Sequence, residues 1–541
     1  MAEKRKASFM GNVAAILGSQ VVIKLIGFAY NLVLINLPGF GDLGNGYRAA
    51  GYQFYTMLLA ISSVGIPNAI SKLISERLAL DDRAGAERVF KTALRLFAGI
   101  GLAGTLLLYW GADFIALRLV RMNGVQYTLR ALSPSIFFVC ISSVIRGYFL
   151  GRQNVRPNNR SQLLEQIFKA VLTILFVTLL SDTTAAVMAA GANAATAVST
   201  AFSCAYLVIV LVTFRKKSPL PQSGGEVIPW TRTAKQILSL SIPISLSSII
   251  TTVARVIDTA TISRGIARAF ADGIPGIEGI PTEAQLQAYA AQLSGMLNKA
   301  DNITNLPLAL NIAFATVLVP TISAALAVGD RKTAGKRISY SYLISTILIL
   351  PCAAGLIILA QPFFQVFYPN AMDGAPLLQW ASVALIFTAL DQTICGSLQG
   401  LGRVNIPAIG LFCGAVVKVI LNLILIRIPS VNIYGAVISS VVCHLIAWAI
   451  CFTALRRAIP LRMKRTKYFT KPILCTLFMS LVTWGSYRLG SLFLPPLFAL
   501  LLSVFLSILA YGAAILGLHV LNRKELLEFP GGGYLVRLLH L

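Results

Sequence analysis

Apolar segments long enough to cross a membrane recur along the whole of this 541-residue chain. A helix needs about 20 mostly apolar residues to span the hydrocarbon core of a bilayer. The sequence therefore predicts an all-α polytopic membrane protein with about fourteen transmembrane helices. We expect these helices at residues 11–37, 49–73, 89–110, 131–150, 161–181, 185–213, 237–262, 303–328, 337–360, 376–400, 407–427, 433–455, 471–490 and 496–520.

The composition fits a membrane protein better than a soluble one. The chain is 56% hydrophobic and only 12% charged, whereas about 25% of residues are charged in an average soluble domain. Its net charge of +26 does not indicate nucleic-acid binding, because most Lys and Arg fall beside the same ends of the predicted spans. This is the positive-inside pattern. It predicts that both termini are cytoplasmic and that the basic segments contact membrane lipids.

An internal repeat divides the chain into two similar halves. Residues 147–169 read GYFLGRQNVRPNNRSQLLEQIFK, and residues 396–418 read GSLQGLGRVNIPAIGLFCGAVVK, 249 positions later. Each segment begins with G-x-x-x-G, crosses a short polar turn and ends on a Lys inside the next apolar segment. Two further pairs are similar at nearly the same spacing: 65–70 with 318–323, and 81–89 with 330–338.

Six predicted helices per half give both halves the same orientation in the membrane. Parallel repeats of this kind are typical of transporters. We expect an N-lobe, a cytoplasmic linker, a C-lobe, and two further helices with a cytoplasmic tail, at residues 1–213, 214–236, 237–455 and 456–541. The predicted outer loop at 263–302 has no long counterpart in the first half. We expect it to be either a surface insertion or a lid over the substrate path.

The basic residues within the predicted spans that need an explanation are Lys24, Lys72, Arg95, Arg146, Lys169, Arg255 and Lys418. A charge that faces lipid at the bilayer centre costs about 2.5–3.5 kcal/mol on insertion scales. Lys72, Arg95 and Arg146 lie near the inner ends of spans, so their side chains can reach the surface. Lys24 and Arg255 lie deeper, in the first helix of each predicted lobe. We expect them to face each other across a water-filled cavity, although buried structural pairing is the alternative.

Acidic residues near these cations suggest internal pairs. Glu165 and Lys169 lie four residues apart, the spacing of helix neighbours. Asp258 lies one turn from Arg255, and it is also a candidate partner for Lys418, which has no acid one turn away. For these residues, structural and functional roles are both open.

A cavity lined by cations would bind an anion, and Lys and Arg are well suited to phosphate. The apolar surface of the last two spans suggests that this anion is attached to a lipid. The hydrophilic loops are too short for a catalytic domain, so we predict that the protein is not an enzyme and has no cofactor. We also predict no metal site, because the three histidines are scattered and the eight cysteines form no C-x-x-C pair.

Three segments resemble a known family of exporters. They are LGSQVVIKLIGFAYN at 17–31, GIPNAISKLISE at 65–76 and RGYFLGRQNVRP at 146–157. These segments are similar to the stage V sporulation protein B branch of the polysaccharide-export flippases, which includes MurJ-like lipid II flippases. The resemblance implies the multidrug/oligosaccharidyl-lipid/polysaccharide (MOP) exporter fold in a bacterial plasma membrane. It also implies a groove for a polyprenyl tail beside the last two spans.

The same resemblance implies the function. We predict a flippase that moves an undecaprenyl-diphosphate-linked sugar, lipid II, outward for peptidoglycan synthesis, cell-wall biogenesis and cell shape. Other cell-wall synthesis proteins are candidate partners. The alternatives are a flippase for another lipid-linked polysaccharide unit, a sporulation-specific version, and a cation-coupled multidrug antiporter, which would favour acids in the cavity.

Carrying the family's motifs over to this chain gives a partial match. The Gram-negative MurJ proteins have the pattern Arg-x-x-Gly-Phe-x-Arg-Asp in the first helix, which reads Lys24-Leu-Ile-Gly-Phe-Ala-Tyr30-Asn31 here. Their pattern Ala-Asp-Arg-x-x-Glu-x-Pro in the eighth helix reads Ala-Asp-Asn302-Ile-Thr-Asn305-Leu-Pro here, so the Arg and the Glu are both replaced by Asn. We therefore expect Lys24 and Arg255 to contact the diphosphate, with Asn31, Asn302 and Lys169 in secondary positions. Some relatives have a sodium site that uses acids on helices 7 and 11. Asp258 is a candidate for the first acid, but Lys418 and Asn422 stand in the second region, so we predict no firm sodium dependence.

Overall fold

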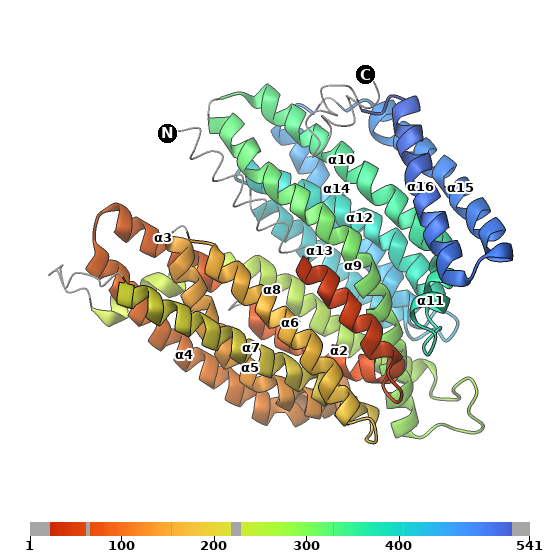
Figure 1. The fold of residues 1–541 in the computed structure, drawn as a ribbon, viewed down its shortest axis with the longest axis horizontal. Helices are drawn as coiled ribbons and strands as arrows, with labels where there is room; N and C mark the ends of the chain where they lie inside the picture. The colour runs from red at the N-terminus through yellow and green to blue at the C-terminus, as the bar shows by residue number, and fades with distance from the viewer. Residues whose placement is uncertain are drawn as a thin grey trace. The chain divides into compact units, whose positions relative to one another are not determined.

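The computed structural model describes residues 22–60, 65–152, 154–217, 229–327, 329–403, 405–461 and 463–521. All regular elements in this part of the chain are helices (Figure 1). Within the same residues, nine helices are long and apolar enough to cross a membrane. These observations confirm the predicted all-α membrane protein, while the number of fourteen spans stays a prediction. Residues 11–21 of the first predicted span, 218–228 of the predicted linker and 522–541 of the predicted tail lie outside the described residues.

The chain forms two compact units. Unit 1 comprises residues 1–299 and 422–433, and unit 2 comprises residues 300–421 and 434–541. The predicted lobes divide the chain differently, because they assign the helix near residue 237 to the second lobe. In the compact units that helix belongs to unit 1.

Unit 1 is a bundle arranged around one central helix. Its helices are Val22–Asn36, α2 (Gly41–Ala60), α3 (Ile66–Ala79), α4 (Arg83–Asp113) with a π-helical continuation (Phe114–Val120), α5 (Val125–Gly151), α6 (Arg156–Leu179), α7 (Ala185–Lys217), α8 (Trp230–Ala269) and the first part of α9 (Glu283–Ala327). Helix α5 packs against α2, α3, α4 and α7. It is therefore the core of this unit.

Helix α2 begins at Gly41, earlier than the predicted start at residue 49. Two glycines, one on α2 and one on α9, allow close packing between these helices. A Cβ added at Gly46 would overlap the carbonyl oxygen of Ala291, and one added at Gly295 would overlap that of Asp42. Glycine at these positions lets two helix backbones touch, and the earlier start of α2 follows from that contact.

The G-x-x-x-G of the repeat is a helix contact in unit 1. A Cβ added at Gly147 of α5 would lie 2.9 Å from the carbonyl oxygen of Pro67, and one at Gly151 would lie 2.9 Å from that of Ser71. Both partners are on α3, within the segment GIPNAISKLISE. Two of the three segments that carry the family resemblance therefore pack against each other.

We expect Gly147→Leu to destabilise unit 1, because the side chain has no space between α5 and α3. Overpacking of this kind costs about 1–3 kcal/mol, which is measured as a lower unfolding temperature in detergent. The matched control is Gly99→Leu on α4, where an added Cβ meets nothing within 4 Å. Equal unfolding temperatures for the two variants would show that the contact is unimportant.

The turns before α4 and α10 (Arg331–Ile358) are built alike. Asp82 caps α4 by accepting a hydrogen bond from the Gly85 backbone N–H at 2.7 Å. Asp330 caps α10 by accepting one from the Thr333 N–H at 2.9 Å. Such caps satisfy backbone donors at a helix start. Hydrogen bonds from the side chain and backbone of Thr333 hold the pKa of the Asp330 carboxyl below its ordinary value.

This pair of caps corrects the register of the repeat. Asp82 and Asp330 are 248 positions apart, one fewer than the spacing of the G-x-x-x-G segments. The residues before them, Asp81 (φ 55°) and Gly329 (φ 76°), both have left-handed backbones. A second matched pair, Gly124 (φ 111°) and Gly374 (φ 105°), precedes α5 and its counterpart α12 (Ala375–Gly400) at a spacing of 250. The repeat is therefore structural, but its spacing varies along the chain.

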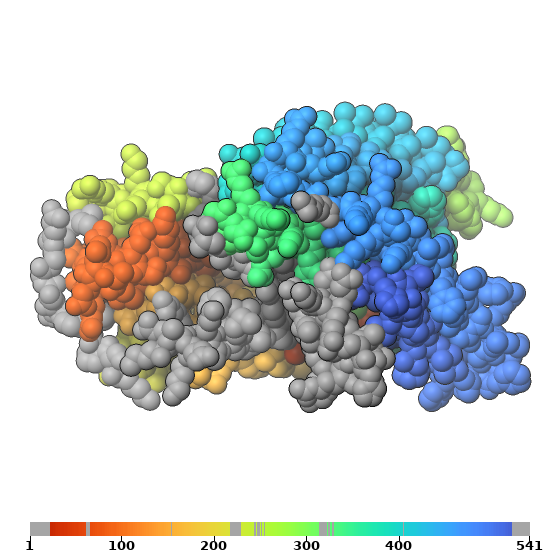
Figure 2. All heavy atoms as spheres, turned by 90° about the horizontal axis from the view of Figure 1, so that it is seen from above, coloured from red at the N-terminus to blue at the C-terminus, as the bar shows by residue number. Residues whose placement is uncertain are grey.

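Unit 2 contains the rest of α9, α10, α11 (Ala360–Phe367), α12, α13 (Asn405–Leu425) up to Leu421, α14 (Tyr434–Ala458), α15 (Lys471–Phe493) and α16 (Pro496–Gly517). Helix α12 packs between α10 and α14. Helices α15 and α16 pair with each other, and they lie at one edge of this unit (Figures 1 and 2). The hydroxyl of Tyr511 on α16 donates to the Ile347 carbonyl of α10 at 2.8 Å, which ties this pair to the unit.

Candidate functional site

Four basic side chains from four helices of unit 1 lie near one another. They are Lys24 on Val22–Asn36, Arg48 on α2, Lys169 on α6 and Arg255 on α8. Lys24 lies within electrostatic range of both Arg255 and Lys169, and Lys169 lies within range of Arg48. The Lys24 and Arg255 side chains are exposed, and the other two are partly buried. We call these four residues the cationic cluster.

Neutral polar side chains hold Arg48 in position. Its guanidinium donates to the Asn31 Oδ1 at 3.0 Å and to the Asn45 Oδ1 at 2.8 Å. Asn31 and Asn45 are 4% and 0% exposed, so these two bonds fix the Arg48 guanidinium from the buried side. The phenol of Tyr30 lies within electrostatic range of both Arg48 and Lys169.

Lys169 is held by an aromatic ring. Its Nζ lies 3.4 Å from the Tyr52 hydroxyl oxygen and 4.6 Å from the centre of the Tyr52 ring. A cation over an aromatic face is attracted by the ring quadrupole. Tyr52 thus positions the ammonium group without neutralising its charge.

The cationic cluster has no acidic partner in the described part of the chain. None of its four members is in an ion pair there; the ion pairs of unit 1 involve other residues. Neighbouring like charges raise each other's energy, and an anion between them removes that repulsion. The arrangement is therefore suited to bind a multiply charged anion.

Glu165 pairs with a different cation from the one predicted. Its Oε2 lies 2.9 Å from a guanidinium nitrogen of Arg146, which also donates to Ser161 and Ser203. The predicted Glu165–Lys169 pair is wrong, because Lys169 turns toward Tyr52. The prediction that the Arg146 side chain reaches the surface is also wrong, because its side chain is only 15% exposed within this network.

Asp258 accepts a hydrogen bond from Asn422 rather than forming the predicted pair with Arg255. The Asn422 Nδ2 lies 2.8 Å from the Asp258 Oδ1 and 3.4 Å from the Thr261 hydroxyl. Lys418 and Asn302 belong to unit 2. Their roles at the substrate, and the contact of Lys418 with Asp258, stay predictions.

A buried ion pair that we did not predict lies on the same face of α2. The Lys299 Nζ is 2.8 Å from the Asp42 Oδ1, and the two side chains are 0% and 6% exposed. Asn45 donates to the Gly295 carbonyl at 2.9 Å. The segment 283–299, predicted as part of an insertion or lid, is thus anchored to α2 within unit 1.

Sequence reasoning missed Arg48, Asn45 and Asp42 because it placed them before the second span. The spacing of the polar residues could nonetheless have identified them. Asp42, Asn45, Arg48 and Tyr52 follow one another at spacings of three, three and four, which put them on one face of a helix. A polar stripe in a membrane helix indicates a protein or water contact.

An apolar cavity lies between α15 and α16 in unit 2. It has a volume of about 540 Å³ and is lined by Val482, Gly485, Ser486, Leu489, Gly490, Phe493, Leu494, Leu502 and Leu506. Leu489 and Phe493 are 65% and 84% exposed. The cavity therefore offers an apolar surface that an acyl or isoprenoid chain could occupy.

Comparison with known families decides the class of this chain. A family model described as polysaccharide biosynthesis protein matches residues 9–326, more than half of the chain. The chain belongs to this family. A second model, described as lipid II flippase MurJ, matches residues 290–505. The resemblance found from the sequence is thereby confirmed.

Two relatives of this chain come from Bacillus subtilis (strain 168). Lipid II flippase MurJ is 25% identical over 77% of this chain and 77% of its own length. Stage V sporulation protein B is 24% identical over 86% of each chain.

Solved structures share its fold. An inward closed lipid II flippase MurJ matches with a TM-score of 0.69 and 15% identity, over 92% of this chain and 97% of its own. An inward-facing multidrug resistance MATE family transporter of the MOP superfamily matches with a TM-score of 0.66 and 16% identity, over 82% and 97%. This family member is therefore a multi-pass membrane protein with the fold of MOP transporters.

Proposed function

We propose that this protein is a flippase that moves an undecaprenyl-diphosphate-linked sugar precursor, lipid II, from the inner to the outer leaflet of a bacterial plasma membrane. Its role would be in peptidoglycan synthesis. The observation that carries the proposal is the cationic cluster, whose members form no ion pair with any described residue. Arg and Lys are the side chains that suit phosphate oxygens, and a diphosphate offers two adjacent anionic groups to several cations at once.

The cavity between α15 and α16 supports a lipid-linked cargo. An isoprenoid tail stays in an apolar environment throughout the reaction, because about 0.8 kcal/mol is gained for each buried CH₂. A surface lined by Leu489, Phe493 and Leu502 suits that tail while the charged headgroup crosses elsewhere.

The membrane potential favours outward movement of the anion. Each elementary charge that crosses 100 mV is worth about 2.3 kcal/mol. Two negative charges that leave a negative interior therefore release about 4.6 kcal/mol per 100 mV. Alternating access driven by this potential needs no ATP site.

A different lipid-linked sugar is the second candidate cargo. Tyr30 and Asn31 stand where the lipid II flippases of Gram-negative bacteria have Arg and Asp, and stage V sporulation protein B matches over a larger share of the chain than MurJ does. A multidrug antiporter is less well supported, because the cluster consists of cations, whereas cationic drugs require acids.

Reconstitution tests the cargo. The full chain in proteoliposomes should move fluorescent lipid II to the outer leaflet, scored by access of a membrane-impermeant quencher. Undecaprenyl phosphate and a neutral lipid of equal chain length are the comparison cargoes. Movement of a different lipid-linked oligosaccharide but not lipid II would select the second candidate, and movement of none would reject a flippase.

We expect Gly485→Phe to slow the transport of full-length lipid II, because the ring fills the cavity between α15 and α16. A short-chain lipid II analogue should be transported at the wild-type rate. Gly512→Phe on α16 is the matched control, since neither glycine has an atom within 4 Å of an added Cβ and Gly512 does not line the cavity. Equal slowing by both variants would remove the cavity from the proposal.

A further inference from the structure

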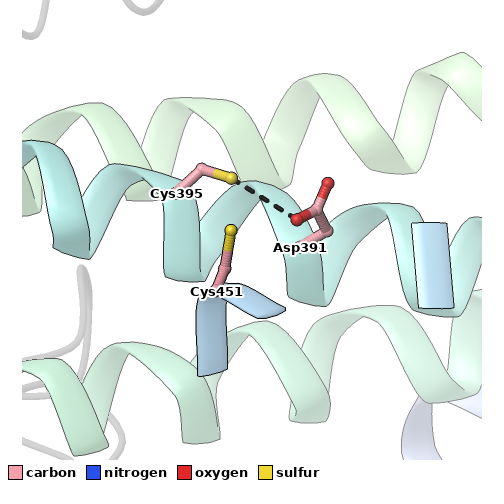
Figure 3. A group of neighbouring side chains, drawn as sticks. All are labelled: Asp391, Cys395 and Cys451. Atoms are coloured by element: carbon pink, nitrogen blue, oxygen red, sulfur yellow. Dashed lines mark hydrogen bonds between the residues drawn. The ribbon is translucent and has the colours of Figure 1, made fainter. Parts of the chain in front are cut away.

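Helices α12 and α14 of unit 2 bring three ligating side chains together. Asp391 and Cys395 on α12 and Cys451 on α14 lie with their ligand atoms all within 4.8 Å of one another (Figure 3). The Cys395 thiol donates to the Asp391 Oδ1 at 3.4 Å. Asp391 and Cys451 are 3% and 0% exposed, and Cys395 is partly buried. The cluster is thus embedded within the unit and separate from the cationic cluster.

His444 extends this cluster. Its Nδ1 lies 3.5 Å from the Asp391 Oδ2, the carboxylate oxygen that does not contact Cys395. This Nδ1 is buried and makes no hydrogen bond in the described structure. His444 and Cys451 are seven residues apart on α14, and Asp391 and Cys395 are four apart on α12, so each pair shares one helix face.

The carboxylate of Asp391 lacks a fixed positive partner. In the described part of the chain, no Lys or Arg forms an ion pair with it. A buried carboxylate is costly unless it is paired or coordinates a metal. A cation held between Asp391 and the two thiols would remove that cost.

The donor set identifies the kind of cation. Thiolates select borderline and soft ions such as zinc, whereas sodium, magnesium and calcium prefer oxygen. Around a tetrahedral zinc ion, a sulfur ligand and an oxygen ligand are about 3.6 Å apart, as follows from the usual bond lengths. The observed separation of 3.4 Å between the Cys395 Sγ and the Asp391 Oδ1 is close to this value.

We propose that Cys395, Cys451 and Asp391 bind a divalent cation of the zinc class, and that His444 orients the carboxylate from the second oxygen. Binding displaces the two thiol protons, which leave with solvent, and forms two metal–sulfur bonds and one metal–oxygen bond. The ion would cross-link α12 to α14. Sequence spacing alone could not indicate this site, because Cys451 lies 56 residues after Cys395.

Cobalt and zinc are the probes for this site. The full chain, purified in detergent under reducing conditions, should retain one equivalent of zinc by elemental analysis. Added Co²⁺ should give a thiolate-to-cobalt charge-transfer band that zinc abolishes. Cys395→Ser and Cys451→Ser should each remove this band, and His444→Ala should weaken binding about 10- to 100-fold, as is usual for an orienting partner.

Cys140→Ser and Cys204→Ser are the matched controls, because both thiols are buried and belong to unit 1, whereas the cluster belongs to unit 2. They should leave metal binding unchanged. Wild-type protein without zinc and without the cobalt band overturns the proposal, and this result does not depend on how any variant folds. Mass spectrometry of the wild-type protein purified under reducing conditions could instead detect a Cys395–Cys451 disulfide. That result would also overturn the metal site, because the two cysteines would then form a redox pair.

Discussion

The double variant Lys24→Ala/Arg255→Ala is expected to abolish transport while the chain still folds. Both side chains are exposed within unit 1 and form no ion pair in the described structure, so their removal leaves no buried charge behind. A hydrogen bond to a charged group contributes about 1.5–3 kcal/mol, so each alanine should slow transport about 10- to 150-fold. The measurement is growth of a flippase-depleted strain, together with lipid II movement in proteoliposomes.

Two further variants make this test specific. Arg95→Ala removes an exposed basic side chain from α4, away from the cationic cluster, and should leave transport unchanged. Arg48→Lys keeps the charge but loses the paired hydrogen bonds to Asn31 and Asn45, so it should slow transport less than Arg48→Ala. Normal growth and normal transport by the Lys24→Ala/Arg255→Ala protein would refute the assignment of the site.

Lys299→Met is expected to destabilise unit 1 strongly. It leaves the Asp42 carboxylate buried at 6% exposure without its partner, and breaking a buried ion pair from one side costs about 3–5 kcal/mol. The loss should appear as a lower unfolding temperature and as faster proteolysis within residues 283–299. An apolar replacement of both partners is often tolerated, so Asp42→Leu/Lys299→Met should recover much of the stability.

The control for this experiment is the exposed pair Lys72–Glu76. Its atoms are 3.9 Å apart, and its side chains are 57% and 54% exposed; such pairs contribute about 0–1 kcal/mol. Lys72→Met should therefore change the unfolding temperature little. If Lys299→Met were as mild as Lys72→Met, the segment 283–299 would be held by packing alone.

Local sequence pattern predicted the helices well where apolar runs are long and bounded by turn residues. Predicted 131–150, 161–181 and 376–400 correspond closely to α5, α6 and α12. The predicted span 49–73 starts later than α2, which begins at Gly41 and contacts α9 through Gly46. Glycine pattern alone does not distinguish a flexible loop from a close helix contact.

The partners of charged residues could not be predicted from spacing along one helix. Lys24, Lys169, Arg255 and Asn31 were identified from their depth in apolar segments and from the family motif. The Arg146–Glu165 and Asp42–Lys299 pairs join different helices, and their partners are 19 and 257 residues apart. Sequence spacing has no information about such pairs, which is why the predicted Glu165–Lys169 pair was wrong.

The uneven spacing of the repeat points to a practical use of the fold. From the Asp82/Asp330 turn to the Gly124/Gly374 turn, the second copy is two residues longer than the first. The capping aspartates and the left-handed glycines at the two ends nevertheless have matching conformations. The connection 368–374, between α11 and α12, is longer than its counterpart 121–124. The fold thus accommodates connections of different length between the same flanking conformations, which makes 368–374 a suitable place to insert an epitope or fluorophore tag for topology mapping.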